Sequence, residues 1–199
     1  MPNVPLRLGT DRSDPGFIDR VAADCAAIER YAGAESRLHN LPNGAGLLVE
    51  GRYPEHEGMI ANGPHLRIAL CTGAGARVVQ RTGGASLEGF WRPGTMAITP
   101  PNGSGEMACG AVSTIGLAVL PSAVSLAPLL DPDRLTSLAG RFLNDPLTAA
   151  VLTALHLEAD LHGASTAFFE HGIALILQRL TEIEEQPQLH RAAYPLSRS

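Results

Sequence analysis

The sequence predicts a mainly β protein with α-helices, in which a barrel of short antiparallel strands is followed by an antiparallel helical hairpin. Three observations lead to this fold class. Between about residues 47 and 120, short runs of alternating apolar and polar residues are separated by glycine, proline and Asn-Gly turns, which is typical of a sandwich or barrel. After Pro121 the apolar residues recur at helical spacing. The 199 residues, 45% of them hydrophobic, suffice for one large domain with a small appendage.

Residues 1–45 are predicted to form an N-terminal arm and a helix. Residues 1–12 show no periodic pattern, whereas Ser13-Asp14-Pro15 is a typical helix start, with a capping side chain and a proline in the first turn. Gly33 marks the expected end of this helix. Its apolar face consists of Ile18, Val21, Ala22, Cys25 and Ile28.

Residues 46–121 are predicted to form the barrel. Because side chains of a strand alternate between its two faces, each strand is expected to bury one face. The turns are expected at Asn43-Gly44, Asn62-Gly63, Gly83-Gly84 and Asn102-Gly103. The alternating apolar residues are Leu66, Ile68 and Leu70, then Leu87, Gly89 and Trp91, and then Ile115, Leu117 and Val119.

The segment from Trp91 to Gly103 contains one short strand between two turns. Pro93-Gly94 closes a tight turn before it, and Pro100-Pro101-Asn102-Gly103 follows it. This spacing resembles the second conserved block of cupin barrels, in which a metal-binding histidine comes next. Here the next polar side chains are Ser104 and Glu106, and no histidine lies between Cys71 and Arg81, where the first block should fall. The resemblance implies a cupin-like barrel, a double-stranded jelly roll, that binds no metal or other cofactor.

Residues 122–185 are predicted to be helical, and 186–199 to be a linker or tail. A short segment from Ser122 to Leu130 comes first. Asn144-Asp145-Pro146 then starts a helix that Gly163 interrupts, and Ser165 or Thr166 starts a second one. The two helices form an antiparallel hairpin. Its apolar face, which includes Ile173 and Leu177, is wider than one neighbour can cover, so we expect it to contact both the barrel and a second copy of the chain, in a homodimer.

The composition excludes several classes of function. The net charge is −5, and all 15 basic residues are arginine. Without lysine the chain has neither a Schiff-base residue nor a P-loop lysine, and without a basic stripe these residues are not expected to bind nucleic acid. No apolar run approaches the roughly 18–20 residues of a membrane span, and no signal peptide is visible. We therefore expect a cytoplasmic protein that does not contact membranes, with Cys25, Cys71 and Cys109 as reduced thiols.

Five motifs resemble the N-terminal half of AraC-type transcription regulators, over roughly residues 46–182. They are His65-Leu66-Arg67-Ile68-Ala69-Leu70, Arg81-Thr82-Gly83-Gly84, Arg92-Pro93-Gly94, Pro100-Pro101-Asn102-Gly103 and Asn144-Asp145-Pro146-Leu147. The resemblance implies that the barrel binds a small-molecule effector and that the helix pair dimerises. In this family a further C-terminal half with two helix-turn-helix motifs reads DNA. The present chain stops where that half would begin, so DNA contact is expected only through a domain that this chain lacks.

The candidate ligand-binding residues are His65, Arg67, Glu88, Trp91 and Met96. If Leu66 and its alternating partners pack outward against the helices, Arg67 points into the barrel and needs an anion there, either Glu88 or a carboxylate or phenolate of the effector. A surface position for Arg67 and a core position for Trp91 remain the alternatives. We assign no catalytic residue. The alternative function is a free-standing cupin-like enzyme, an isomerase, cyclase or lyase, that uses His65, Arg67, Glu88 or Glu106 for acid–base chemistry.

Overall fold

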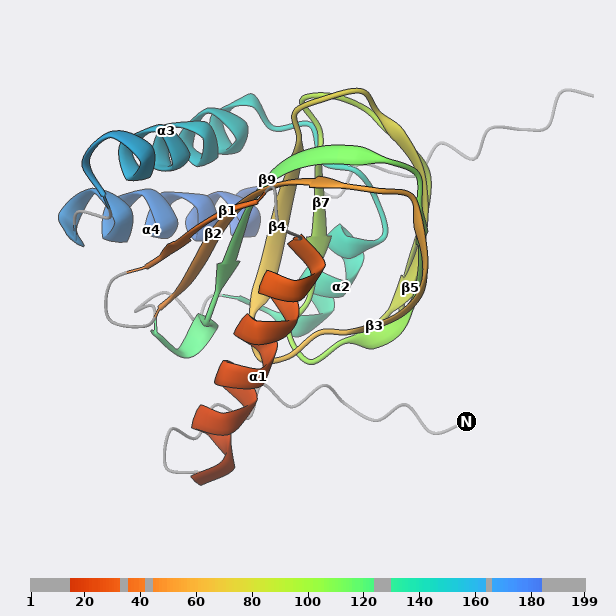
Figure 1. Cartoon of the computed structure of the whole chain (residues 1–199), viewed down its shortest axis with the longest axis horizontal. Helices are drawn as coiled ribbons and strands as arrows, with labels where there is room; N and C mark the ends of the chain where they lie inside the picture. Colours follow the sequence, from red (N-terminus) through yellow and green to blue (C-terminus); the bar gives the residue numbers. More distant parts are fainter. Residues whose placement is uncertain (1–14, 33–35, 42–44, 124–129, 164–165, 184–199) are drawn as a thin grey trace, which may run out of the picture.

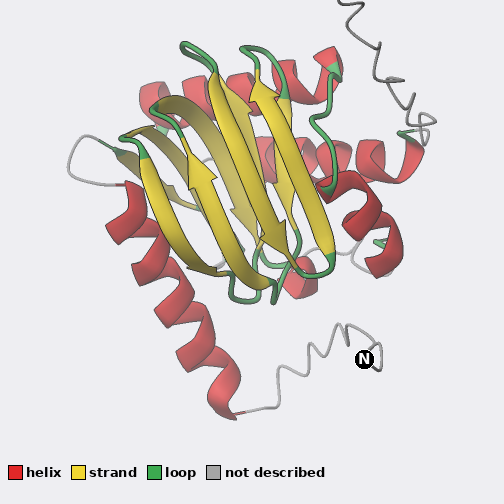
Figure 2. Ribbon diagram, turned by 90° about the vertical axis from the view of Figure 1, so that its right-hand side faces the viewer, coloured by secondary structure: helices red, strands yellow, loops and turns green. Residues whose placement is uncertain are grey.

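The computed structural model describes residues 15–32, 36–41, 45–123, 130–163 and 166–183 (Figures 1 and 2). Within these residues, strands form two antiparallel sheets. The five-stranded sheet has the order β1 (Arg37–Asn40), β2 (Gly46–Tyr53), β9 (Val112–Val119), β4 (Leu66–Cys71), β7 (Met96–Thr99). The four-stranded sheet has the order β3 (His56–Ala61), β8 (Ser104–Cys109), β5 (Ala76–Thr82), β6 (Ala85–Trp91).

This strand order is that of a double-stranded jelly roll, which confirms the predicted fold class. Only β1 with β2 and β5 with β6 are both consecutive in the described chain and paired. Every other connection between consecutive strands of the described chain crosses from one sheet to the other. Strand β1 pairs with β2 along its length, so the sheet begins before residue 46, the predicted start of the barrel.

The Gly83-Gly84 and Pro93-Gly94 turns form as expected, but only the first of these two joins strands that pair with each other. Gly83 and Gly84, with φ of 55° and 85°, form a two-residue turn between paired Thr82 and Ala85. Gly94 has a φ of 80°, and the N–H of Thr95 donates to the carbonyl of Arg92 over 3.1 Å. That turn links β6 to β7 in the opposite sheet. Local turn chemistry was therefore predictable and strand pairing was not. The Asn43-Gly44 turn lies outside the described residues.

The helices are α1 (Pro15–Ala32), α2 (Pro132–Ala139), α3 (Pro146–His162) and α4 (Thr166–Glu182), with a 3-10 turn, η2, at Pro121–Ala123. Of the expected helical segment from Ser122 to Leu130, Ser122 and Ala123 lie in η2 and Leu130 lies in no helix, whereas residues 124–129 lie outside the described part. Asp131 caps α2, so Asp131-Pro132 is a second Asp-Pro helix start that the sequence reading overlooked. None of the described helices is long and apolar enough to cross a membrane.

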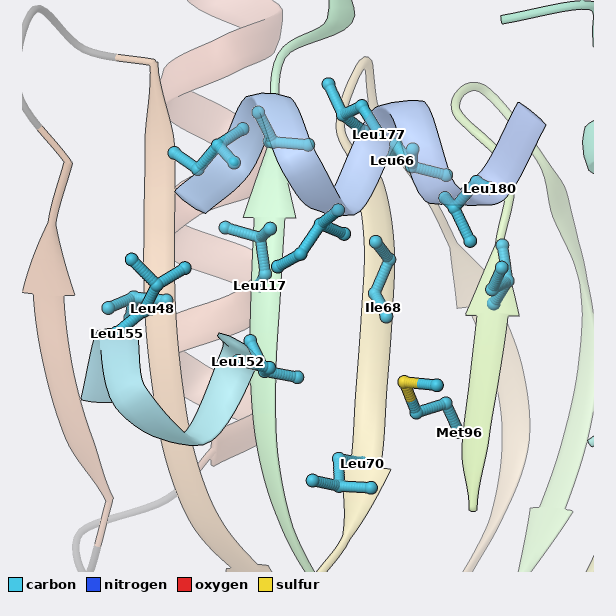
Figure 3. Packing of buried hydrophobic residues seen from close by; sticks show 14 of the residues in the cluster. Leu48, Leu66, Ile68, Leu70, Met96, Leu117, Leu152, Leu155, Leu177 and Leu180 are labelled. Atoms are coloured by element: carbon cyan, nitrogen blue, oxygen red, sulfur yellow. The ribbon is translucent and has the colours of Figure 1, made fainter. Parts of the chain in front are cut away.

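Helices α3 and α4 cover the outer face of the five-stranded sheet (Figures 1 and 3). Ile173 and Leu177 are 4% and 1% exposed and pack in this layer. Because Ile173 and Leu177 are buried within a single chain, they do not form the surface that was expected to meet a second copy. The sheet contributes alternate residues of β2, β4, β7 and β9 to the same layer, among them Leu48, Leu66, Ile68, Leu70, Met96, Ile98, Leu117 and Val119.

Two polar contacts fix the hairpin. The Nε2 of His156 on α3 donates to the carbonyl of Gly116 on β9 over 3.0 Å, since a carbonyl can only accept. Asp145, the N-cap of α3, accepts from the backbone N–H and hydroxyl of Thr148 at 3.0 and 2.6 Å. Its other oxygen accepts two bonds from the Arg179 guanidinium on α4, at 3.0 and 3.1 Å. One carboxylate thus starts α3 and ties α4 to it.

The replacement Asp145→Ala is expected to lower the free energy of unfolding by about 1–2 kcal/mol, the usual cost of losing an N-cap side chain. Urea unfolding followed by circular dichroism measures the change. Asp133→Ala, in the first turn of α2 at an exposed position, is the matched control and should change the same free energy by less than about 0.5 kcal/mol. Equal effects of the two replacements would contradict the capping role of Asp145.

The effect of Asp145→Ala should also depend on pH. Burial raises the pKa of Asp145, but the hydrogen bonds from Arg179 and Thr148 outweigh it and hold the pKa below its ordinary 3.8. Stability from the ionised carboxylate is therefore present above pH 3.8 and is lost as the pH falls through the lowered pKa. The difference in unfolding free energy between wild type and variant should narrow on acidification, and a constant difference would refute this linkage.

Candidate ligand-binding cavity

A cavity of about 460 Å³ lies between the two sheets. Strand alternation creates it: Leu66, Ile68 and Leu70 of β4 point out to the helices, so Arg67 and Ala69 point in. Ala69 pairs with Ala97 in the next strand, and these small side chains leave space. The wall is mostly apolar, from Tyr53, Met59, Ile60, Ala69, Val78, Trp91, Ala97, Met107, Cys109 and Val112, with polar groups from His56, Asn62, Arg67, Gln80, Thr99 and Thr114.

Helix α1 packs on the inner face of the five-stranded sheet and reaches the cavity. Cys25 packs against Leu47, Val49 and Ala118, and Ala27 lines the cavity itself. Figure 2 shows this helix running beside the sheets. The helix therefore covers a part of the inner face next to the cavity.

The carboxylate of Asp24 on α1 joins this helix to the barrel. Asp24 is 5% exposed. One of its oxygens accepts from Nδ1 of His65 at 2.6 Å, and the other accepts from the guanidinium of Arg67. A backbone hydrogen bond from Gly63 completes the set. Because a Cβ at position 63 would lie 2.5 Å from the Cβ of Asp24, only glycine allows this close approach.

Electrostatics keep Asp24 ionised. Burial raises its pKa, but the hydrogen bond from His65, the charge of Arg67 and the bond from Gly63 together lower the pKa below its ordinary 3.8. The positive charge of the Arg67 guanidinium is therefore balanced by the negative charge of Asp24. Since a carboxylate only accepts, Nδ1 of His65 carries a proton, and its Nε2 lies 3.9 Å from the sulfur of Cys25.

Two buried polar atoms at the cavity have no hydrogen-bond partner among the described residues: Nε of Arg67 and Oδ1 of Asn62. The orientation of the Asn62 amide is fixed, because its Nδ2 donates to the carbonyls of His65, at 3.1 Å, and Pro100. Both partners are acceptors, so the amide oxygen must face away from them. Both atoms are buried within the wall rather than exposed to the cavity.

The structure brings three of the five candidate residues to this region. Arg67 and Trp91 line the cavity, and His65 lies fully buried beside Arg67, against Asp24. The Nε1 of Trp91 donates to the carbonyl of Thr95 at 2.9 Å, and its ring stacks on Phe142. Trp91 is thus both a core residue and a wall of the cavity.

Glu88 and Met96 lie outside the cavity, because their side chains point to the outer faces of their strands. Glu88 is exposed on the outer face of β6, 3.3 Å from Arg77, so it is not the anion for Arg67. Met96 is fully buried on the outer face of the five-stranded sheet, among the leucines under α4 (Figure 3). Alternation places Leu87 and Ala97, their neighbours in sequence, on the inner side of the barrel.

Asp24, Asn62 and Gln80 are the site residues that sequence reasoning missed. Asn62 was interpreted only as part of a turn, and Asp24 does not belong to the predicted apolar face of its helix. Gln80 follows the inward phase of β5, and its Nε2 donates to Thr82 and Thr99 at 3.1 and 3.3 Å. The sequence could have indicated Gln80, because this polar residue lies at a position of β5 whose side chains point into the barrel.

Glu106, which the sequence pattern aligns with the metal-binding histidine of cupins, is exposed on β8. Within the described part of the chain, no group of three or more His, Cys, Asp or Glu side chains is arranged to hold a metal. Cys109 lines the cavity, but burial, with a contribution from Cys71, raises the pKa of its thiol to about 11. It therefore remains a protonated, weakly nucleophilic thiol near neutral pH.

No family model matches the chain, and no curated protein matches it in sequence. Among solved structures, the AraC-like transcriptional activator CuxR is similar over 83% of this chain, with a TM-score of 0.54 and 12% identity. The present chain spans 64% of the CuxR chain.

Two cupin structures match more weakly. A mutant of Bacillus subtilis oxalate decarboxylase OxdC is similar over 53% of this chain and 35% of its own, with a TM-score of 0.36 and 10% identity. KdgF from Halomonas sp. is similar over 42% of this chain and 76% of its own, with a TM-score of 0.33 and 11% identity. The likeness to CuxR is a likeness of fold: both chains contain a β-barrel of two antiparallel sheets followed by a helical C-terminal part.

Proposed function

We propose that this chain is the effector-sensing and dimerising part of an AraC-type transcription regulator. The observation that carries the proposal is the cavity between the sheets, which has an apolar wall and a few convergent polar groups, the usual make-up of a small-molecule site. The fold shared with CuxR supports it. In this proposal DNA is bound by a further domain and not by the present residues, and the protein acts in the cytoplasm.

The positions of the acidic residues favour sensing over catalysis. An acid–base enzyme needs titratable groups within reach of its substrate. Glu88 and Glu106 are exposed on the outer surface of the four-stranded sheet, and Asp24 is engaged by three donors. The alternative as an isomerase, cyclase or lyase thus loses the two glutamates on which it relied.

The outer surface of the hairpin supports dimerisation. Of the seven large hydrophobic side chains that are exposed among the described residues, five lie on α3 and α4: Leu147, Leu157, Leu161, Phe168 and Leu175. Exposed apolar side chains gathered on one helical hairpin are typical of an interaction surface. We propose that this surface, and not the buried Ile173 and Leu177, meets the second copy.

Binding in the cavity is tested with Ala69→Leu, which places a larger side chain in it. Metabolites that raise the melting temperature of the wild-type chain are first selected by thermal shift. A ligand present at 100 times its Kd stabilises the folded state by about 2.7 kcal/mol, and Ala69→Leu should abolish this gain. Ala108→Leu, the same change on the outer side of β8, should retain it. Ligands that stabilise both variants equally, or the absence of any ligand, would contradict the cavity as the sensor site.

Dimerisation is tested with charged replacements on the hairpin. Leu161→Glu and Leu157→Glu, at positions 73% and 58% exposed, should give a folded protein with the mass of a single chain in light scattering. Met59→Glu, on β3 and 72% exposed, should leave the dimer mass unchanged. Leu177→Glu should instead unfold the protein, because it buries an unpaired charge. A dimer that survives both hairpin replacements would refute this interface.

A further inference from the structure

Cys25, His65 and Asp24 form a connected row of three side chains where α1 meets the barrel. The Sγ of Cys25 lies 3.9 Å from Nε2 of His65, and Nδ1 of the same ring donates to Asp24 over 2.6 Å. In a neutral imidazole one nitrogen carries the proton and the other a lone pair. Because Nδ1 donates to the carboxylate, Nε2 carries the lone pair that faces the thiol. A nucleophile, a base and a group that orients the base are the parts by which proteins activate a cysteine.

The surroundings of His65 favour transfer of the thiol proton to its ring. His65 is fully buried, and its hydrogen bond to Asp24 fixes the orientation of the ring. Burial raises the pKa of Asp24, but the hydrogen bond from His65 and the charge of Arg67 hold the pKa below its ordinary 3.8. The carboxylate is therefore ionised at neutral pH, and a negative charge beside Nδ1 stabilises the imidazolium that forms when Nε2 accepts a proton.

The other charged and titratable groups around Cys25 come from three described elements. On α1 itself, Asp19 and Arg20 lie at exposed positions. Strand β4 contributes Arg67, and β2 contributes Tyr53, which packs against the same apolar residues as Cys25. Because Arg67 balances the charge of the carboxylate with which it pairs, a thiolate at Cys25 does not face an uncompensated negative charge.

The other two cysteines of the chain differ from Cys25 in access and in surroundings. Cys71 and Cys109 are 1% and 3% exposed, and their thiols donate to backbone carbonyls. Burial raises the pKa of both thiols, that of Cys109 to about 11. Cys25 is half-buried, and the small side chains of Ala22 and Ala26 beside it on α1 are exposed. Cys25 thus combines access from solvent with a neighbouring base.

We propose that Cys25 is a redox-sensitive site that reacts with hydrogen peroxide. His65 takes the proton of the thiol, and Sγ attacks one oxygen of the peroxide. The S–O bond forms as the O–O bond breaks, and the second oxygen leaves with the proton from His65 as water. The sulfur is oxidised by two electrons to a sulfenic acid, and the peroxide is reduced. Asp24 is the positioning residue. This inference does not depend on the proposed effector sensing.

The reaction is tested by incubating the full chain with hydrogen peroxide and dimedone, which traps sulfenic acids. The label on each cysteine is then measured by mass spectrometry after digestion. Cys25 should carry at least about tenfold more label than Cys71 or Cys109, because thiolate character and access govern oxidation. Equal labelling of the three cysteines, or no label on Cys25, would overturn the proposal.

The pH dependence of alkylation by iodoacetamide separates activation by His65 from exposure alone. A thiol with the ordinary pKa of about 8.5 loses roughly fiftyfold of its thiolate between about pH 8.5 and pH 6.5. With His65 as an internal base, the alkylation rate of Cys25 should fall by less than about fivefold over this interval. A steeper fall would refute activation, since Cys25 would then behave as an ordinary exposed thiol.

Matched histidine variants identify the base. His65→Gln removes the base but keeps a donor toward Asp24, so the alkylation of Cys25 should acquire the steep profile of an ordinary thiol. His162→Gln makes the same change at an exposed pair with Glu158 and should leave the shallow profile unchanged. Circular dichroism verifies folding, and the wild-type profile decides even where His65→Gln fails to fold. A shallow profile in folded His65→Gln would overturn the role of His65.

Discussion

The five-stranded sheet must bury both of its faces, and the rest of the structure depends on this constraint. On its outer face the leucines of β4 and β9 pack under α3 and α4, and its inner face borders α1 and the cavity. Because the two faces alternate residue by residue, the pairing of β4 with β9 determines which side chains reach the cavity. A shift of one residue would move Arg67 under the helices and Leu66 into the cavity. The register of this pair therefore fixes the packing and the site together.

Local features were predictable from the sequence, and distant contacts were not. The Pro93-Gly94 and Gly83-Gly84 turns and the Asp145-Pro146 helix start follow from backbone preferences of a few neighbouring residues. The inward direction of Arg67 followed from the apolar phase of β4, once the helices were placed on the leucine side. The partner of Arg67 could not be found in this way. Asp24 approaches it only because α1 packs beside the barrel, and no periodic pattern in either segment encodes that contact.

Two buried carboxylates perform similar tasks at opposite ends of the chain. Asp24 joins α1 to the barrel through His65 and Arg67, and Asp145 joins the start of α3 to Arg179 of α4. Replacing such pairs with apolar residues of similar shape often leaves a protein equally stable. Their contribution is directional, because a carboxylate that accepts several bonds from fixed donors permits few orientations of its helix. Each pair therefore determines where a helix lies more than how strongly it is held.

The hydrogen bond between His156 and the carbonyl of Gly116 has a mechanical consequence. Thr114, two residues earlier on β9, lines the cavity, so the cavity and the hairpin share β9 as a common wall one backbone thick. Burial lowers the pKa of His156, and the uncharged ring remains a donor to that carbonyl. Closely packed interiors have little free volume to absorb a displacement. A movement of β9 toward or away from the cavity is thus also a movement of α3, passed directly through the side chain of His156.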